Sequence, residues 1–345
     1  MRILPGISSV VSLAARVGES YEDAAILSMH GKKLNHLPTT VVSHEKTFLL
    51  TSGSEDIRKI GRMLTETGLT DCEVIVGYQL SYPEENIRIL MPEQCVEVTE
   101  EGLYTCLIRN PHPQPELLTH GRADTCFLRD ASGTEGKLRR TPMTKEEVRE
   151  VSICKLHLTD GAVVYDIGSG TGSVAVEIAG LSETVHVYAV ERKPEAVELL
   201  RKNREHFHMD NMEIIEALAP EGLEELPVPT HAFIGGSGGR LMDILQTLYR
   251  KNPHMRIVIN AISMETIAEL QEVLEAFPVE DEEILQMQVN RVKKLGSYHL
   301  PQAENPVWIC SFTFREGETG SMNKVKKALL TEEENGNRKN GEVQR

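Results

Sequence analysis

Cysteine is scarce in this chain, which has six cysteines among 345 residues and no C-x-x-C pair. Such scattered cysteines exclude the dense disulfide framework of small secreted domains, and no Cys- or His-rich spacing is typical of a metal site. Histidines such as His186 and His231 fall in or beside expected strands, where packing or hydrogen bonding is their more common role. We therefore expect reduced thiols, a cytoplasmic location and no bound metal.

Long apolar runs are also missing, since no stretch approaches the roughly 18 consecutive apolar residues of a membrane span. Near the start of the chain, Pro5 and Gly6 interrupt the apolar residues, unlike the continuous run of a signal peptide. Positive charge is in deficit, because 37 lysines and arginines face 52 acidic residues, a net charge of −15. These features predict a soluble protein that binds neither nucleic acid nor membrane non-specifically, and that needs a local basic patch for any anionic partner.

The length favours two domains, because one domain usually takes ~100–200 residues. We expect an α/β domain over residues 1–112, a linker and entry arm over 113–140, a second domain over 141–316 and a polar, disordered tail over 317–345. In the first domain, apolar periodicity predicts helices over 7–17 and 55–67 and strands over 24–30, 47–51, 73–77, 87–91 and 103–108.

From residue 141 onward, strands and helices alternate. Strands are predicted over 162–167, 185–191, 211–217, 231–236 and 256–261, with helices from 173, 194 and 240. This alternation predicts right-handed βαβ crossovers and a doubly wound, mostly parallel sheet. The runs 282–292 and 305–314 are predicted to pair as an antiparallel hairpin at one edge. Another helix is predicted to begin at Thr144, which caps it while Glu147 reaches back in a capping box.

Residues 166–172, DIGSGTG, form a glycine-rich turn between an expected strand and an expected helix. Its three glycines let the backbone approach a ligand closely, and exposed N–H groups favour an anionic or electron-rich one. The spacing differs from the G-x-G-x-x-G of dinucleotide-binding folds, and no G-K-[ST] follows. Glu191 ends the next strand, where a carboxylate can accept both hydroxyls of a ribose. A tight turn that binds nothing is the alternative interpretation.

The D-x-G-x-G-x-G pattern with this second acid resembles the first two motifs of class I S-adenosylmethionine methyltransferases, and it implies their Rossmann-like fold and their cofactor, S-adenosyl-L-methionine. The resemblance places the methionine end of the cofactor against Asp166, Gly168, Ser169, Gly170, Thr171 and Gly172. It places the ribose against Glu191 and the adenine near Ala217 and Leu218. Leu218 stands where many such enzymes have an acid. Thr144 is a further cofactor-binding residue by this interpretation, beside its capping role.

A loop of small residues follows the fourth strand of the second domain, at a position where amino-group methyltransferases carry a proline-aromatic turn. It consists of Gly235, Gly236, Ser237, Gly238 and Gly239. Such a loop leaves room for a large, flat substrate to approach the donor methyl group, and we expect it to position the reacting groups. A flexible turn without a role in binding remains the alternative, and no residue identifies itself as a general acid.

Together with "PMTKEEVR", "APEGL" and "NPVWI", these motifs are similar to the decarboxylating methyltransferase family of corrin biosynthesis, over about residues 118–316. The resemblance implies methylation of carbon 15 of a precorrin or cobalt-precorrin, with decarboxylation of a ring acetate, in cobalamin biosynthesis. Methyl transfer from a sulfonium requires alignment of the reactants more than a strong base. The substrate's carboxylates require local cations, for which we favour Arg240 and Arg291. Any cobalt belongs to the substrate.

The first domain resembles a second family. Its segments "LTSG" and "VGYQLSYPEENI" are similar to the tetrapyrrole carbon-5 methylase domain that precedes the carbon-15 domain in precorrin-6Y methyltransferases. The match begins in mid-family, so we expect an absent N-terminal subdomain and no independent carbon-5 activity. Two alternative functions stay open: the chain is a donor-binding scaffold for a separate subunit that supplies the missing half, or it is a class I methyltransferase of protein or RNA. Whether it forms a homo-oligomer is open as well.

Overall fold

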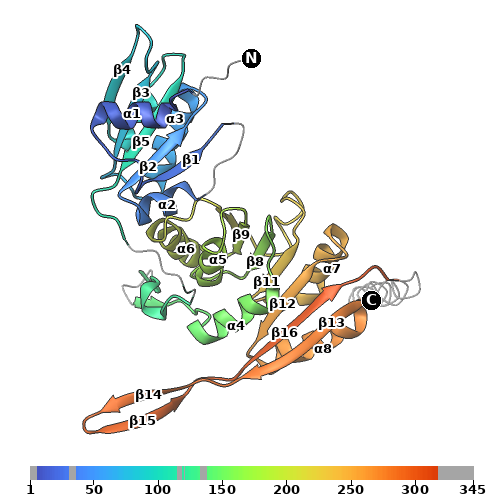
Figure 1. Ribbon diagram of the computed structural model, residues 1–345. Coiled ribbons are helices and arrows are strands. Elements are labelled where there is room, and N and C mark those ends of the chain that lie inside the picture. The colour runs from blue at the N-terminus through green and yellow to red at the C-terminus, as the bar shows by residue number, and fades with distance from the viewer. Residues whose placement is uncertain (1–5, 31–35, 115–118, 120, 133–137, 318–345) are drawn as a thin grey trace, which may run out of the picture. The chain divides into compact units, whose positions relative to one another are not determined.

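A computed structural model describes residues 6–30, 36–114, 119, 121–132 and 138–317, and these are the described residues below (Figure 1). Two compact units divide the chain: the first comprises residues 1–120, 176–185 and 199–213, and the second comprises 121–175, 186–198 and 214–345. The predicted tail lies outside the described residues from 318 onward. Within the described part of the chain, no helix is long and apolar enough to cross a membrane.

A five-stranded mixed sheet forms the core of the first unit, with the strand order β1-β2-β5-β3-β4. Its strands are β1 (Ala25–Ser28), β2 (Lys46–Leu50), β3 (Glu73–Tyr78), β4 (Asn86–Leu90) and β5 (Tyr104–Arg109). Helix α1 (Ser9–Val17) packs on one face through Leu13, and α3 (Ser54–Glu66) packs on the other through Ile57 and Ile60. The predicted elements of this region are confirmed, but the helix α2 (Leu37–Ser43) and the 3-10 helix η1 (Pro92–Glu97) were not predicted.

A seven-stranded sheet follows later in the chain, with the order β10-β9-β8-β11-β12-β16-β13. Its strands are β8 (Val163–Ile167), β9 (His186–Glu191), β10 (Met212–Glu216), β11 (His231–Ile234), β12 (Arg256–Ala261), β13 (Val279–Met287) and β16 (Val307–Phe314). β8, β9, β11 and β12 run parallel, whereas β16 is antiparallel to both β12 and β13. This confirms the predicted doubly wound sheet with an antiparallel edge.

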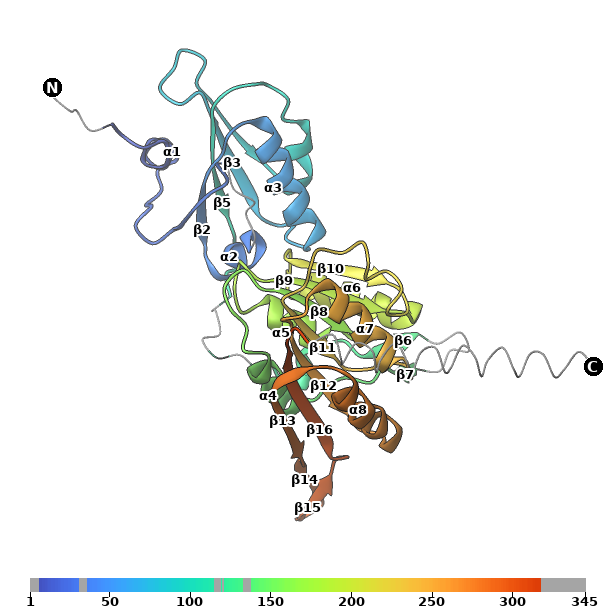
Figure 2. The ribbon, with the colours of Figure 1, turned by 90° about the vertical axis from the view of Figure 1, so that its right-hand side faces the viewer.

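Helices alternate with most strands of the seven-stranded sheet along the chain. They are α4 (Glu146–Leu156), α5 (Ser173–Ala179), α6 (Pro194–His206), α7 (Leu241–Lys251) and α8 (Met264–Ala276), of which α8 was not predicted. Figure 2 shows α4 and α8 on opposite sides of the sheet, next to β12 and β16. Helix α7 buries Ile244, Leu245 and Leu248 against the sheet, because these positions share one face of a helix. The core on this face ends in a group of packed aromatic rings that includes Phe312 and Phe314.

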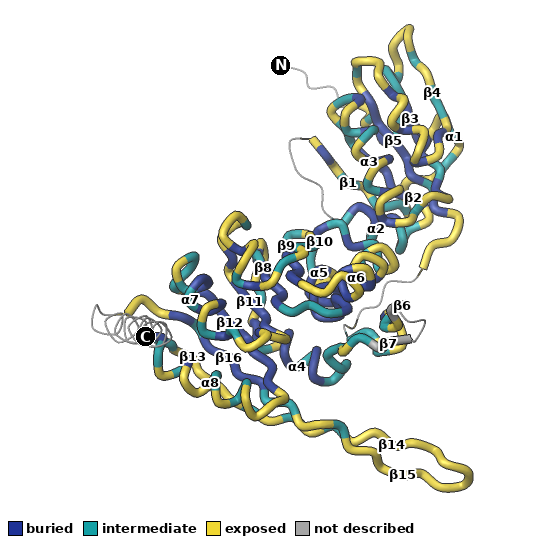
Figure 3. Tube along the Cα trace, turned by 180° about the vertical axis from the view of Figure 1, so that it is seen from behind, coloured by how far each residue is buried: buried dark blue, intermediate teal, exposed yellow. Residues whose placement is uncertain are grey.

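The predicted edge hairpin is confirmed where β13 pairs with β16, for example Met287 with Val307. The prediction was wrong beyond that point, because residues 290–292 belong to a separate ribbon of β14 (Asn290–Leu295) and β15 (Tyr298–Ala303). Every residue of this ribbon is exposed, as the yellow tube in Figure 3 shows. The ribbon buries no apolar face of its own, so the sequence contains no strict alternation that could have predicted it.

The segment predicted as a linker and entry arm has some regular structure. A 3-10 helix, η2, spans Asp124–Cys126, and the short strands β6 (Asp130–Ser132) and β7 (Leu138–Arg140) pair antiparallel. Side chains from η2 and from the adjacent loop contact the start of α4, and these contacts shape the site described below.

Candidate functional site

The cavity of interest lies at the carboxyl ends of the parallel strands in the second unit. β8 is flanked by β9 on one side and by β11 on the other, so the strand order reverses at β8. Ligands in doubly wound folds bind in the crevice that such a reversal opens. A cavity of about 480 Å³ is lined here by residues that follow β8, β9, β10, β11 and β12. That volume suits a small-molecule ligand.

The glycine turn after β8 forms the floor of the cavity through Gly168, Ser169 and Gly170. Gly168 and Gly170 have φ angles of +72° and +59°, which L side chains rarely adopt. A Cβ atom on Gly168 would lie 2.5 Å from the carbonyl oxygen of Gly236. The first glycine is therefore required because two backbones, those after β8 and β11, meet there.

Glu191, the last residue of β9, also lines the cavity and is 8% exposed. The Gly170 amide donates to its Oε2 at 3.0 Å, and the amides of Arg192 and Lys193 donate to its Oε1 at 2.9 Å each. A carboxylate has about four acceptor positions, two on each oxygen, so one position remains on Oε2 for a ligand. The three backbone donors fix the orientation of the carboxylate.

Asp166 lies beneath the turn and is not among the residues that line the cavity. It is 1% exposed, and its Oδ2 accepts hydrogen bonds from Ser169 Oγ at 2.6 Å and from the Ala175 amide at 3.1 Å. Burial raises the pKa of Asp166 to about 7, and these two hydrogen bonds oppose the rise. The carboxylate thus ties the turn to the start of α5. Thr171 and Gly172, also predicted to bind the cofactor, do not line the cavity either.

The raised pKa of Asp166 predicts a pH-dependent stability. Because an unfolded aspartate has a pKa of about 4, the folded protein holds a proton that the unfolded chain has lost between pH 4 and 7. Stability therefore falls as pH rises through this window. Asp166→Asn removes the titration. The quantity to compare is the melting temperature of the variant minus that of wild type. We expect this difference to be about 5 °C larger at pH 8 than at pH 5.

Differential scanning fluorimetry of the protein without ligand measures this difference. Asp160→Asn changes an exposed acid just before β8 and serves as the control, for which the difference from wild type should be the same at both pH values. If the Asp166→Asn difference were also the same at both values, Asp166 would be ionised in the folded protein.

The wall next to the turn is formed by Ala217 and Leu218 after β10 and by the loop after β11. Gly235, Gly236, Ser237 and Gly238 line the cavity, and Gly239 does not. The Gly235 amide donates to the Ile167 carbonyl at 2.9 Å, and Ser237 is 7% exposed. A Cβ atom on Gly238 would lie 3.9 Å from Leu218. The hydrogen bond of Gly235 holds the start of this loop against the end of β8.

The third wall is the segment Thr141–Lys145, which precedes α4. Thr144 lines the cavity, but its predicted capping box with Glu147 is wrong. The helix begins at Glu146, its cap residue is Lys145, and the Lys145 side chain makes no cap hydrogen bond. The Thr144 carbonyl instead accepts from Arg149, and Glu147 pairs with Arg291. An acid from outside the local sequence takes the capping role, which local pattern matching does not detect.

Sequence analysis missed several residues of the lining, among them Asn260, Ile262 and Val289 at or after the ends of β12 and β13. Asn260 is 8% exposed, and its side chain lies 3.0 Å from Ser152 Oγ on α4. A polar residue at the carboxyl end of the strand "RIVINA" is the one sequence signal that could have identified it. Ile262 is 60% exposed and adds apolar surface at the cavity.

Both arginines predicted to bind substrate carboxylates are ion-paired. Arg240 contacts Glu221 at 2.6 Å and Asp243 at 3.5 Å, and Arg291 contacts Glu147 at 2.6 Å. Neither arginine lines the cavity. Their role in substrate binding stays a prediction. Among the residues that the structure describes, no cluster of His, Cys, Asp and Glu is suited to a metal ion, and burial lowers the pKa of His231.

Comparison with known proteins decides the family. The model of a family described as "Precorrin methyltransferase domain" matches residues 139–313, which is half of the chain. The chain belongs to the precorrin methyltransferase domain family. The matched residues contain every strand of the seven-stranded sheet except the last residue of β16, and they contain the whole lining of the cavity.

Individual relatives agree with this assignment. The chain is 38% identical over 170 residues to the "Probable cobalt-precorrin-6B C(15)-methyltransferase (decarboxylating)" of Pyrobaculum calidifontis, covering 49% of this chain and 87% of that protein. It is 26% identical over 273 residues to the precorrin-6Y C(5,15)-methyltransferase [decarboxylating] of a Sinorhizobium species, and the match covers 78% of this chain and 64% of that protein. The crystal structure of precorrin-6Y C5,15-methyltransferase from Geobacter metallireducens matches with a TM-score of 0.51 and a sequence identity of 34%. This match covers 56% of the present chain and 97% of the crystallised one.

The precorrin methyltransferase domain is thus an S-adenosylmethionine-dependent methyltransferase, which confirms the predicted enzyme class and cofactor. The cavity fits this cofactor in two respects. Gly168 and Gly170 remove side chains where a ligand must approach the backbone, and Glu191 presents a fixed acceptor oxygen, Oε2, at the position expected for the ribose. The particular contacts of each residue with the cofactor remain predictions.

Proposed function

We propose that this chain transfers a methyl group from S-adenosylmethionine to carbon 15 of a precorrin or cobalt-precorrin, with decarboxylation of an acetate of the same macrocycle. One observation carries the proposal: a single cavity joins the glycine turn to a wall of small and apolar groups. The names of the relatives agree with this activity. The five-stranded sheet of the first unit has no role in the proposal.

The cavity has a donor end and an acceptor end. The donor end includes the glycine turn, Glu191 and Thr144, and the acceptor end includes Asn260, Ile262, Val289, Glu304 and Asn305. A flat macrocycle would lie on the apolar surface of Ile262 and Val289, because burying such surface is favourable. The carboxamide of Asn260, held by Ser152, would donate a hydrogen bond to one of its carboxylates.

The glycine loop lies between these ends. Gly236 lies against the glycine turn after β8, and a Cβ atom built on Gly236 would meet nothing within 4 Å. That open space lets carbon 15 come into line with the methyl group and the sulfur, the geometry that a direct displacement needs. When bound, S-adenosylmethionine supplies the methyl group. The new carbon–carbon bond would take its electron pair from the macrocycle, while the pair of the broken methyl–sulfur bond would stay on the sulfur of the departing S-adenosylhomocysteine. The electrons released with carbon dioxide would pass into the conjugated ring.

Mass spectrometry of the product tests the proposal. The purified chain is incubated with S-adenosylmethionine and a precorrin-6-type substrate, with and without cobalt, and the Gly168→Ala variant serves as the control. We expect one added methyl group together with loss of carbon dioxide. Methyl transfer without that loss, or transfer to RNA or protein but not to the precorrin, would overturn it. Two added methyl groups would contradict the assignment of the activity to carbon 15 alone.

A further inference from the structure

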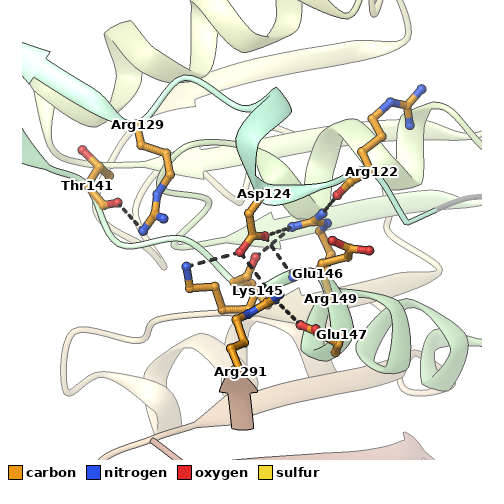
Figure 4. Close-up of polar contacts among 10 residues, drawn as sticks. Arg122, Asp124, Arg129, Thr141, Lys145, Glu146, Glu147, Arg149 and Arg291 are labelled. Atoms are coloured by element: carbon orange, nitrogen blue, oxygen red, sulfur yellow. Dashed lines mark hydrogen bonds and ion pairs between the residues drawn. The ribbon is translucent and has the colours of Figure 1, made fainter. Parts of the chain in front are cut away.

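A cluster of charged side chains lies behind the third wall of the cavity, with Asp124 at its centre (Figure 4). One carboxylate oxygen of Asp124, Oδ1, accepts from the Glu146 amide at 3.0 Å and from Arg149 at 3.4 Å. The other, Oδ2, lies 3.2 Å from Lys145 Nζ and 4.0 Å from the Arg291 guanidinium. A single carboxylate thus contacts α4, the segment before α4 and the exposed ribbon.

We propose that Asp124 is a positioning residue for S-adenosylmethionine. Asp124 holds the segment Thr141–Lys145 against the donor end of the cavity. It touches neither reactant in this proposal and acts through the wall. The proposal concerns the donor, so it does not rest on which acceptor the proposed function assigns.

The first argument is that Asp124 supplies the helix cap that the local sequence lacks. Lys145 is the cap residue of α4 and makes no side-chain cap hydrogen bond. The first amides of a helix need acceptors, and a negative charge there is stabilised by the helix dipole. Asp124 meets both requirements from 22 residues upstream, through the Glu146 amide. The start of α4, and with it the end of the third wall, is therefore fixed by a non-local contact.

The second argument concerns Arg149, which is fully buried and holds the same wall from inside. Its guanidinium donates to the Thr144 carbonyl at 2.9 Å and to the Arg122 carbonyl, and it lies 4.8 Å from the centre of the Phe127 ring. A buried cation requires a counter-charge, and Asp124 provides one. Removal of the Asp124 charge would therefore weaken the hold of Arg149 on Thr144.

The third argument is the distance from the held segment to the donor turn. A Cβ atom on Gly170 would lie only 3.3 Å from the Pro142 carbonyl, so this wall lies directly over the turn. Its other end is fixed as well, because the Thr141 amide donates to the Arg129 carbonyl at 2.9 Å. A displaced wall would leave the donor end open on this side.

Donor affinity measured by calorimetry tests the proposal, with S-adenosylmethionine and S-adenosylhomocysteine as probes. The apparent dissociation constant is the intrinsic one divided by the fraction of molecules whose wall is in place. If Asp124→Ala lowers that fraction to about one tenth, both dissociation constants rise about tenfold. Asp124→Asn keeps an oxygen for the Glu146 amide but loses the charge, so we expect a smaller rise. At saturating donor, the rate constant for methyl transfer should change less than the donor KM.

Two control variants separate positioning from general stability. Lys155→Ala breaks an ion pair of the same helix, with Glu283 at 2.6 Å, away from the cavity. Leu248→Ala destabilises the core of α7, where the side chain is fully buried. Both should leave donor affinity near the wild-type value below their melting temperatures. The proposal fails if Asp124→Ala binds donor as tightly as wild type, or if Leu248→Ala weakens binding to the same degree.

Discussion

Substitution of Gly168 by alanine is expected to abolish donor binding and to lower the free energy of unfolding by about 2–4 kcal/mol. Two costs combine in this variant. The left-handed backbone at φ +72° costs an alanine roughly 1 kcal/mol. In addition, the new Cβ atom would lie 2.5 Å from the Gly236 carbonyl oxygen and 2.9 Å from the Gly236 amide nitrogen. Both neighbours are backbone atoms, so the loop after β11 must move away from the turn.

A matched variant separates the two costs. Gly161 has φ +73°, nearly the same as Gly168, but a Cβ atom there would meet nothing within 4 Å. Gly161→Ala should therefore show the backbone cost alone and should keep donor affinity. Chemical denaturation and calorimetric titration with S-adenosylhomocysteine measure both quantities. Equal destabilisation of the two variants, or donor binding by Gly168→Ala, would show that the close approach of the two loops is unimportant.

Much of the second domain was predictable because its strands carry a local signal. β8, β9, β11 and β12 are short apolar runs with turn residues at their ends, and parallel strands buried on both faces have this pattern. Their order along the chain then fixes which strand ends meet. The glycine turn and Glu191 were identified for the same reason, since each immediately follows or ends such a strand.

The remaining features depend on contacts between distant residues. The cap of α4 is supplied by Asp124, so Thr144 and Glu147 formed a convincing local pattern without forming the contact. Asp166 was placed beside the ligand by its motif, yet its side chain points into the protein and ties the turn to α5. The spacing of a motif thus identifies a residue that the turn needs, but it does not distinguish contact with a ligand from support of the backbone.

These two cases explain how the donor site is built. The turn after β8 is fixed from below by Asp166 and from the side by Glu191, whereas the wall over it depends on Asp124. A carboxyl oxygen is the acceptor in each contact, and each side chain accepts at least one backbone amide. A hydrogen bond of this kind to an ionised carboxylate is about twice as strong as one between neutral groups. Accordingly, an acid at any of these positions contributes to the shape of the cavity, and Glu191 alone of the three lines it.

Glu191→Gln is expected to raise the dissociation constant of S-adenosylmethionine about 100-fold. Oε2 has an unused acceptor position for a ribose hydroxyl, and a hydrogen bond to a charged group contributes about 1.5–3 kcal/mol. Glutamine replaces one acceptor oxygen by an NH2 group. That group would face either the Gly170 amide or the amides of Arg192 and Lys193, all of which are donors. The substitution therefore also disturbs the orientation of the side chain. Calorimetric titration measures the change.

A donor analogue tests whether the ribose is the group that Glu191 recognises. Wild-type protein should bind S-adenosylhomocysteine much more tightly than its 2′-deoxy analogue, and Glu191→Gln should bind the two with similar affinity. Glu216→Gln, at the exposed carboxyl end of the neighbouring strand β10, should discriminate as wild type does, because that side chain does not line the cavity. If Glu191→Gln still distinguished the two analogues as strongly as wild type, recognition of the ribose would have to be assigned to another group, and the carboxylate of Glu191 would serve only to hold the turn.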